Sequence, residues 1–93
     1  MGTSDTWYGH PIQGPSPQTL WQVLSWTATE PPGSTVQVYY RINGALGTWI
    51  NAGTSPAILN VAGQSFEVKA VLSATNGATA PTLGTVMVNY LIP

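Results

Sequence analysis

Charged residues are scarce in this 93-residue chain, at 5% of the sequence against about a quarter in typical soluble domains. The net charge of −1 leaves no basic patch that could neutralise a phosphate backbone, which argues against nucleic-acid binding. The polar surface must instead be built from Thr, Ser, Asn, Gln and Gly. Such a surface suits an uncharged, hydrogen-bonding ligand such as a glycan. It also suits a subunit of a larger assembly, because little net charge keeps copies apart.

Catalytic and metal-binding residue types are also few. Cysteine is absent, which excludes disulfides and thiolate zinc sites. An enzyme needs a nucleophile with a base, a converging pair of carboxylates, or a metal. His10 and Asp5 lie in the Gly/Pro-rich N-terminal part, and Glu30 stands beside a double proline. Glu67 alternates with Lys69 on one strand face, which indicates a solvated cross-strand or same-face pair. We therefore expect no enzymatic activity, no cofactor and no metal.

Long apolar runs are missing as well. None approaches the roughly 20 residues that a bilayer-spanning helix needs, so no membrane partner is expected. Residues 1–8 contain no basic segment followed by an apolar one, so no secretory signal peptide is expected there.

Short alternating segments separated by turn signals are what the chain does contain. Thr35–Ile42 and Ser65–Ser73 alternate most cleanly, and further strands are predicted at 20–28, 48–50, 56–61 and 85–92. No apolar period near 3.6 persists, so little or no helix is expected. The pattern predicts an all-β chain with a single antiparallel β-sandwich domain at 20–93. Residues 1–19, rich in Gly and Pro, predict an irregular arm or edge segment.

Alternation divides the aromatic residues into two sets. Trp26, Tyr40 and Tyr90 are in phase with apolar faces, so we expect them in the core. The other aromatic residues and one arginine are out of phase with a core, or lie in the arm or a short edge strand. These are the candidate ligand-binding residues: Trp7, Tyr8, Trp21, Tyr39, Arg41 and Trp49.

Three interpretations of these candidates remain open. Exposed rings could stack on the apolar face of a sugar while Arg41 binds its hydroxyls. The same residues could form a subunit interface, where Trp, Tyr and Arg are enriched. Alternatively, the arm could fold back and bury Trp21 or Trp49 beneath Trp7 and Ile12.

A core tryptophan, a Pro-Gly loop and a late strand ending in tyrosine carry a family resemblance over about residues 20–92. The residues concerned are Leu24-Ser25-Trp26-Thr27-Ala28, Pro32-Gly33-Ser34-Thr35, the Val36–Arg41 strand, Trp49, the 63–72 segment, Pro81-Thr82-Leu83 and Val86-Met87-Val88-Asn89-Tyr90. In this order they resemble a β-sandwich pattern of bacteriophage tail, fibre and baseplate proteins, similar to discoidin-like, galactose-binding jelly rolls. The resemblance implies a jelly-roll-like sandwich in an extracellular virion, assembled in the host cytoplasm.

Two functions follow as expectations. The first is a non-catalytic tail-fibre or baseplate module that attaches to a cell-surface glycan, with other virion proteins as partners. The alternative is a structural assembly or capsid-decorating protein that acts through oligomeric contacts without a glycan. Its contacts would involve the arm and the outward apolar residues Val71, Met87 and Leu91. We expect a homo-oligomer because few charges oppose self-association.

Overall fold

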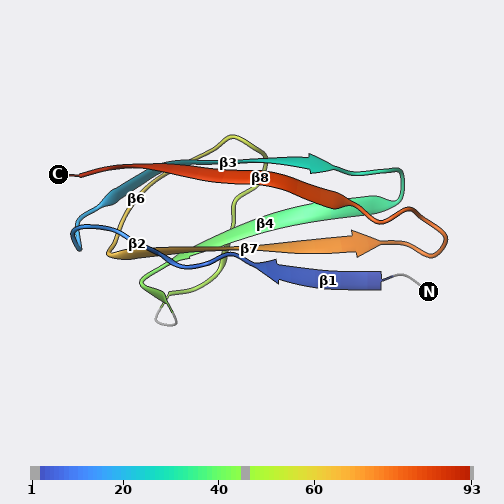
Figure 1. Cartoon of the computed structure of the whole chain (residues 1–93), viewed down its shortest axis with the longest axis horizontal. Coiled ribbons are helices and arrows are strands. Elements are labelled where there is room, and N and C mark those ends of the chain that lie inside the picture. The colour runs from blue at the N-terminus through green and yellow to red at the C-terminus, as the bar shows by residue number, and fades with distance from the viewer. Residues whose placement is uncertain (1–2, 45–46, 93) are drawn as a thin grey trace.

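Two antiparallel β-sheets, packed face to face, make up the computed structural model, which describes residues 3–44 and 47–92 (Figure 1). Every strand pair is antiparallel. No α-helix occurs in the described ranges, which confirms the predicted all-β sandwich. Within the same ranges, no helix is long and apolar enough to cross a membrane.

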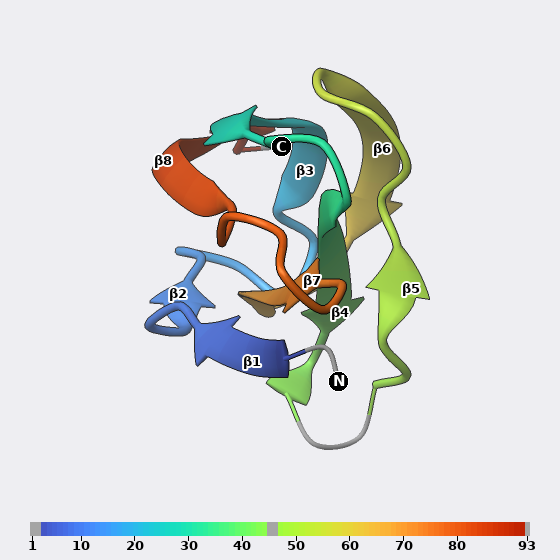
Figure 2. The same cartoon turned by 90° about the vertical axis from the view of Figure 1, so that its right-hand side faces the viewer.

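The larger sheet, sheet A, has the order β1-β7-β4-β5, with β2 also paired to β7, and sheet B has the order β6-β3-β8. The strands of sheet A are β1 (Thr3–Tyr8), β2 (Ile12–Gln13), β4 (Ser34–Ile42), β5 (Ile50–Asn51) and β7 (Ser65–Ala74). Those of sheet B are β3 (Leu20–Thr29), β6 (Ala57–Ala62) and β8 (Thr82–Leu91). The chain passes from one sheet to the other at five of its seven connections, so the layers are interleaved in sequence (Figure 2).

The N-terminal segment, predicted as an arm or an irregular edge segment, contains a regular strand. All of β1 pairs with β7 in continuous register, from Thr3 opposite Ala74 to Tyr8 opposite Lys69. This stretch contains no proline or glycine, so its backbone can complete the ladder, and the first breaker is Gly9. The segment therefore supplies an edge strand of sheet A.

The core lies between the sheets and centres on Trp21, which is fully buried. Its ring centroid lies 5.0 Å from that of Phe66 and 5.2 Å from that of Tyr90. Its indole N–H donates to the carbonyl oxygen of Gly63 at 3.0 Å, which satisfies the polar tip of the ring. Alternate residues of β4 and β7 complete the core: Val38, Tyr40, Phe66, Val68 and Ala70.

The outward orientation predicted for Trp21 is wrong, and a β-bulge explains the error. The register shifts between Trp21 and Val23, where β3 has one more residue than β8. The extra residue reverses the alternation, so Trp21 and Leu24 both face the core. Tyr40 is buried as predicted and Trp26 packs partly buried against the core, whereas Tyr90 is 46% exposed because β8 is an edge strand.

Replacing Trp21 should measure how far the sandwich depends on this ring. We expect Trp21→Ala to lower the free energy of unfolding by about 3–5 kcal/mol, because it leaves a cavity and an unpaired carbonyl between the sheets. The matched control is Ile58→Ala on β6, whose side chain is 76% exposed, and it should change stability by about 1 kcal/mol or less. Urea unfolding followed by circular dichroism measures both. Equal losses would contradict the central role of Trp21.

Candidate functional site

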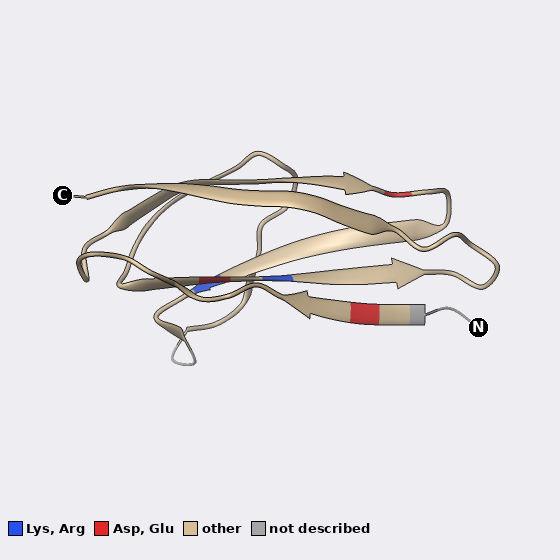
Figure 3. Cartoon of the chain, viewed as in Figure 1, with Lys and Arg blue, Asp and Glu red and all other residues tan. Residues whose placement is uncertain are grey.

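Four of the five charged residues lie on the strands of sheet A (Figure 3). Three of them, Arg41, Glu67 and Lys69, share its outer face. The strand register aligns Tyr8, Lys69 and Tyr39 in one row across β1, β7 and β4. The next row on this face places Glu67 opposite Arg41. Side chains directly opposite on neighbouring strands lie about 5 Å apart, so five residues from three strands come together on one surface.

Trp49 joins this surface from the residue preceding β5. The Arg41 guanidinium carbon lies 4.4 Å from the centroid of the Trp49 ring, and the Lys69 ammonium nitrogen lies 4.8 Å from it. Tyr8 approaches the same ring at 6.3 Å between centroids. We call Tyr8, Tyr39, Arg41, Trp49, Glu67 and Lys69 the Trp49 cluster. Its rings hold both basic side chains of the chain by cation–π attraction.

The ion pair in the cluster joins Glu67 on β7 to Arg41 on β4, and not to Lys69. Arg41 binds Glu67 through two contacts of 3.2 Å, with its Nε donating to Oε1 and its Nη2 to Oε2. The side chains are 22% and 16% exposed, so this fork is partly screened from water. Lys69 instead lies over aromatic rings, 5.2 Å from the centroid of Tyr39. Two cations and one carboxylate give the Trp49 cluster a formal charge of +1 in a chain of net charge −1.

Four of the six predicted candidates, namely Tyr8, Tyr39, Arg41 and Trp49, therefore converge. Trp7 does not join them, because its side chain lies on the other face of β1 from Tyr8. It is opposite Ala70, on the core side at the edge of the sheet, and is 42% exposed. Trp21 is fully buried, with its ring beside those of Phe66 and Tyr90. The prediction did not include Lys69 and Glu67 among site residues, although their outward alternation in 65–73 was a usable signal.

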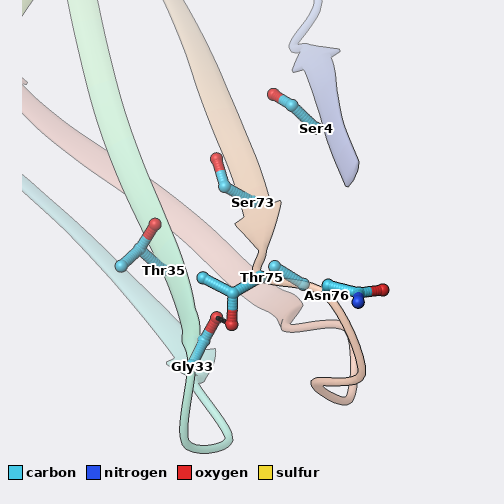
Figure 4. Close-up of a pocket in the computed structure, with 7 residues that line it drawn as sticks. Ser4, Gly33, Thr35, Ser73, Thr75 and Asn76 are labelled. Atoms are coloured by element: carbon cyan, nitrogen blue, oxygen red, sulfur yellow. Dashed lines mark hydrogen bonds between the residues drawn. The ribbon is translucent and has the colours of Figure 1, made fainter. Parts of the chain in front are cut away.

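A second feature of the same face is a hollow of about 390 Å³ at the far end of sheet A (Figure 4). Hydroxyl and amide side chains from β1, β4, β7 and the loop after β7 line it: Ser4, Thr35, Ser73, Thr75 and Asn76. The hydroxyl and backbone N–H of Thr75 both donate to the carbonyl of Gly33, at 3.2 and 2.8 Å, which ties the two loops at its rim together. None of the lining side chains is charged, and most of the surface that the hollow exposes is apolar, so it offers few hydrogen bonds and suits a neutral ligand.

Comparison with models of known protein families, with curated proteins and with solved structures gives no significant match. Among the described residues, no three His, Asp or Glu side chains come close enough together to hold a metal ion.

A double-mutant cycle should show that Glu67 is coupled to Arg41 and not to its neighbour on the strand. For Arg41→Gln and Glu67→Gln we expect a coupling energy of about 0.5–1 kcal/mol, since the fork is bidentate and partly buried. The matched cycle with Lys69→Gln should give a smaller value, because Lys69 contacts rings. Urea unfolding at low and high salt measures both cycles, and equal coupling in the two would show that the fork does not form in solution.

Proposed function

We propose that this chain is a non-catalytic carbohydrate-binding module that uses the outer face of sheet A. The observation that carries the proposal is the convergence of three aromatic side chains with two cations on one face of a domain that otherwise has very little charge. Flat rings stack on the apolar faces of sugars, and fixed polar groups beside them select the hydroxyls.

The rings of the Trp49 cluster are accessible to different degrees. Tyr8 is 65% exposed, whereas Tyr39 and Trp49 are half-buried. The Arg41–Glu67 fork fixes the position of Arg41, and Arg41 and Lys69 together contact Trp49. A ring held in this way loses less conformational entropy when a ligand stacks on it, which favours binding.

Hydrogen-bonding groups surround the rings. The Tyr39 hydroxyl donates to Oε1 of Gln37 at 3.0 Å, and the amide nitrogen of Gln37 is available to a ligand. Arg41 uses two of its five N–H groups on Glu67, and the remaining three can reach sugar hydroxyls. These donors, with the Lys69 ammonium group, suit a hydroxyl-rich ligand, and the surplus positive charge also accommodates an acidic sugar.

The hollow beside Ser4, Thr35 and Ser73 lies on the same face and lengthens the candidate surface. Ser73 stands four residues beyond Lys69 on β7, a separation of about 13 Å along the strand. A glycan of several sugar units lying along β7 would contact the Trp49 cluster at one end and the Ser4–Ser73–Thr35 row at the other.

A location in the virion, in a phage tail fibre or baseplate, is part of the proposal. The support for it is the resemblance of residues 20–92 to phage tail, fibre and baseplate sandwiches. Attachment to host-surface carbohydrate is the role that unites this resemblance with the aromatic face of sheet A.

Glycan binding should depend on two rings of the Trp49 cluster and not on a third tryptophan. A glycan array identifies a ligand, and titration calorimetry then compares variants. We expect Trp49→Ala and Tyr39→Ala each to weaken binding at least tenfold, or about 1.4 kcal/mol, because each removes a stacking surface.

The matched control is Trp7→Ala, which deletes a partly exposed ring on the core side of β1. It should leave affinity within about twofold of the original, well under 1 kcal/mol. An array without hits, or equal losses in all three variants, would refute the proposal.

A further inference from the structure

The C-terminal part of strand β8 forms an edge of sheet B that lacks the usual protection against pairing with another chain. The strand has ten residues, none of them charged and none proline. A bulge interrupts it between Leu83 and Val86, and residues 86–91 then continue without a break. The other edge strands are shorter, interrupted or charged. β1 has six residues and contains Asp5, β5 has two, and β6 has six, with Asn60 in a positive-φ conformation. Long, uncharged edge strands are templates for strand addition, because their outer N–H and C=O groups have no partner in the sheet.

Exposed apolar side chains accompany this edge. Met87 is 62% exposed, Tyr90 46%, Leu91 51% and Ile92, directly after the strand, 62%. The three strands of sheet B contain no charged residue at all, in contrast to sheet A (Figure 3). Four large apolar residues are thus exposed near one end of an edge strand, and such clusters are typical of interaction sites.

We propose that β8 pairs antiparallel with β8 of a second copy of this chain about a twofold axis. The two copies of sheet B then form one continuous six-stranded sheet. With the twofold axis at Asn89, residues 87–91 of the two copies pair and add on the order of five backbone hydrogen bonds. Met87 of each copy then lies opposite Leu91 of the other, and Tyr90 lies opposite Val88.

The absence of charge on β8 favours a second copy of this chain as its pairing partner. A twofold axis brings the same strand segment of both chains together, so any charged residue near the axis would face its own like charge. Sheet B has no such residue, and it also offers no charge to select a partner of opposite sign. The paired part of β8 therefore meets no like-charge repulsion from its own copy.

This pairing differs from the oligomeric contact predicted from the sequence. Val71 lies on the outer face of sheet A, level with Thr6 and Gln37, and so on the side of the sandwich away from sheet B. Met87 and Leu91 lie on β8. The three residues do not form one surface, and an edge contact through β8 leaves the Trp49 cluster free. The inference therefore stands independently of the proposed function.

Light scattering coupled to size-exclusion chromatography tests the pairing over roughly 10 µM to 1 mM protein. We expect dimers to form with increasing concentration. The variant Met87→Glu/Leu91→Glu should weaken dimerisation at least tenfold, because it places a carboxylate of one copy opposite a carboxylate of the other. Both side chains are already exposed in the monomer, so the fold should tolerate the change. Circular dichroism confirms that it does.

The matched control is Ile58→Glu on β6, the opposite edge of the same sheet, where the side chain is 76% exposed. Retention of the dimer in this control, together with its loss in the β8 variant, supports edge pairing. Loss of the dimer in both variants would indicate face-to-face stacking of sheets B and overturn the proposal. A monomer at 1 mM, or an oligomer insensitive to the β8 variant, would overturn it as well.

Discussion

The burial of Trp21 between the sheets is the interaction on which the rest of the structure depends. Its ring contacts Phe66 from sheet A and Tyr90 from sheet B, and its indole N–H closes on the carbonyl of Gly63 in the turn between β6 and β7. One side chain thus contacts both sheets and the turn that connects β6 to β7. In a domain with no cysteine and one ion pair among its described residues, large apolar contacts of this kind must provide most of the stabilisation.

Much of the fold could be predicted from alternation, because β4 and β7 keep a strict period of two. Their inward residues, such as Val38 and Phe66, are buried as that pattern indicates. The prediction failed at Trp21 because the bulge in β3 arises from the pairing with β8, and no glycine or proline in Leu20–Thr29 marks it. Alternation also could not show that β8 lies at an edge, which is why Tyr90 is more exposed than predicted.

Most individual residues of the candidate site could be predicted from the sequence, but their proximity in space could not. The outward positions of Tyr39 and Arg41 follow from the alternation of one strand. Their proximity to Tyr8 and Trp49 depends on the order β1-β7-β4-β5, in which three of the four segments are far apart in sequence. Lys69 acquires its role only through this order, since β7 lies beside β4 and the Lys69 ammonium group therefore lies over Tyr39 and Trp49.

The strand directions have a mechanical consequence. The molecule is 48 Å long, and the start of β1 and the end of β8 lie at opposite ends of its long axis (Figure 1). Antiparallel hydrogen bonds run perpendicular to the strands, so tension applied between these two ends would load the β1–β7 and β3–β8 ladders in shear. When a ladder is loaded in shear, many of its hydrogen bonds must break at the same time. When its strands are peeled apart, the hydrogen bonds break one after another. The sandwich is therefore built to carry a pulling force along its strands.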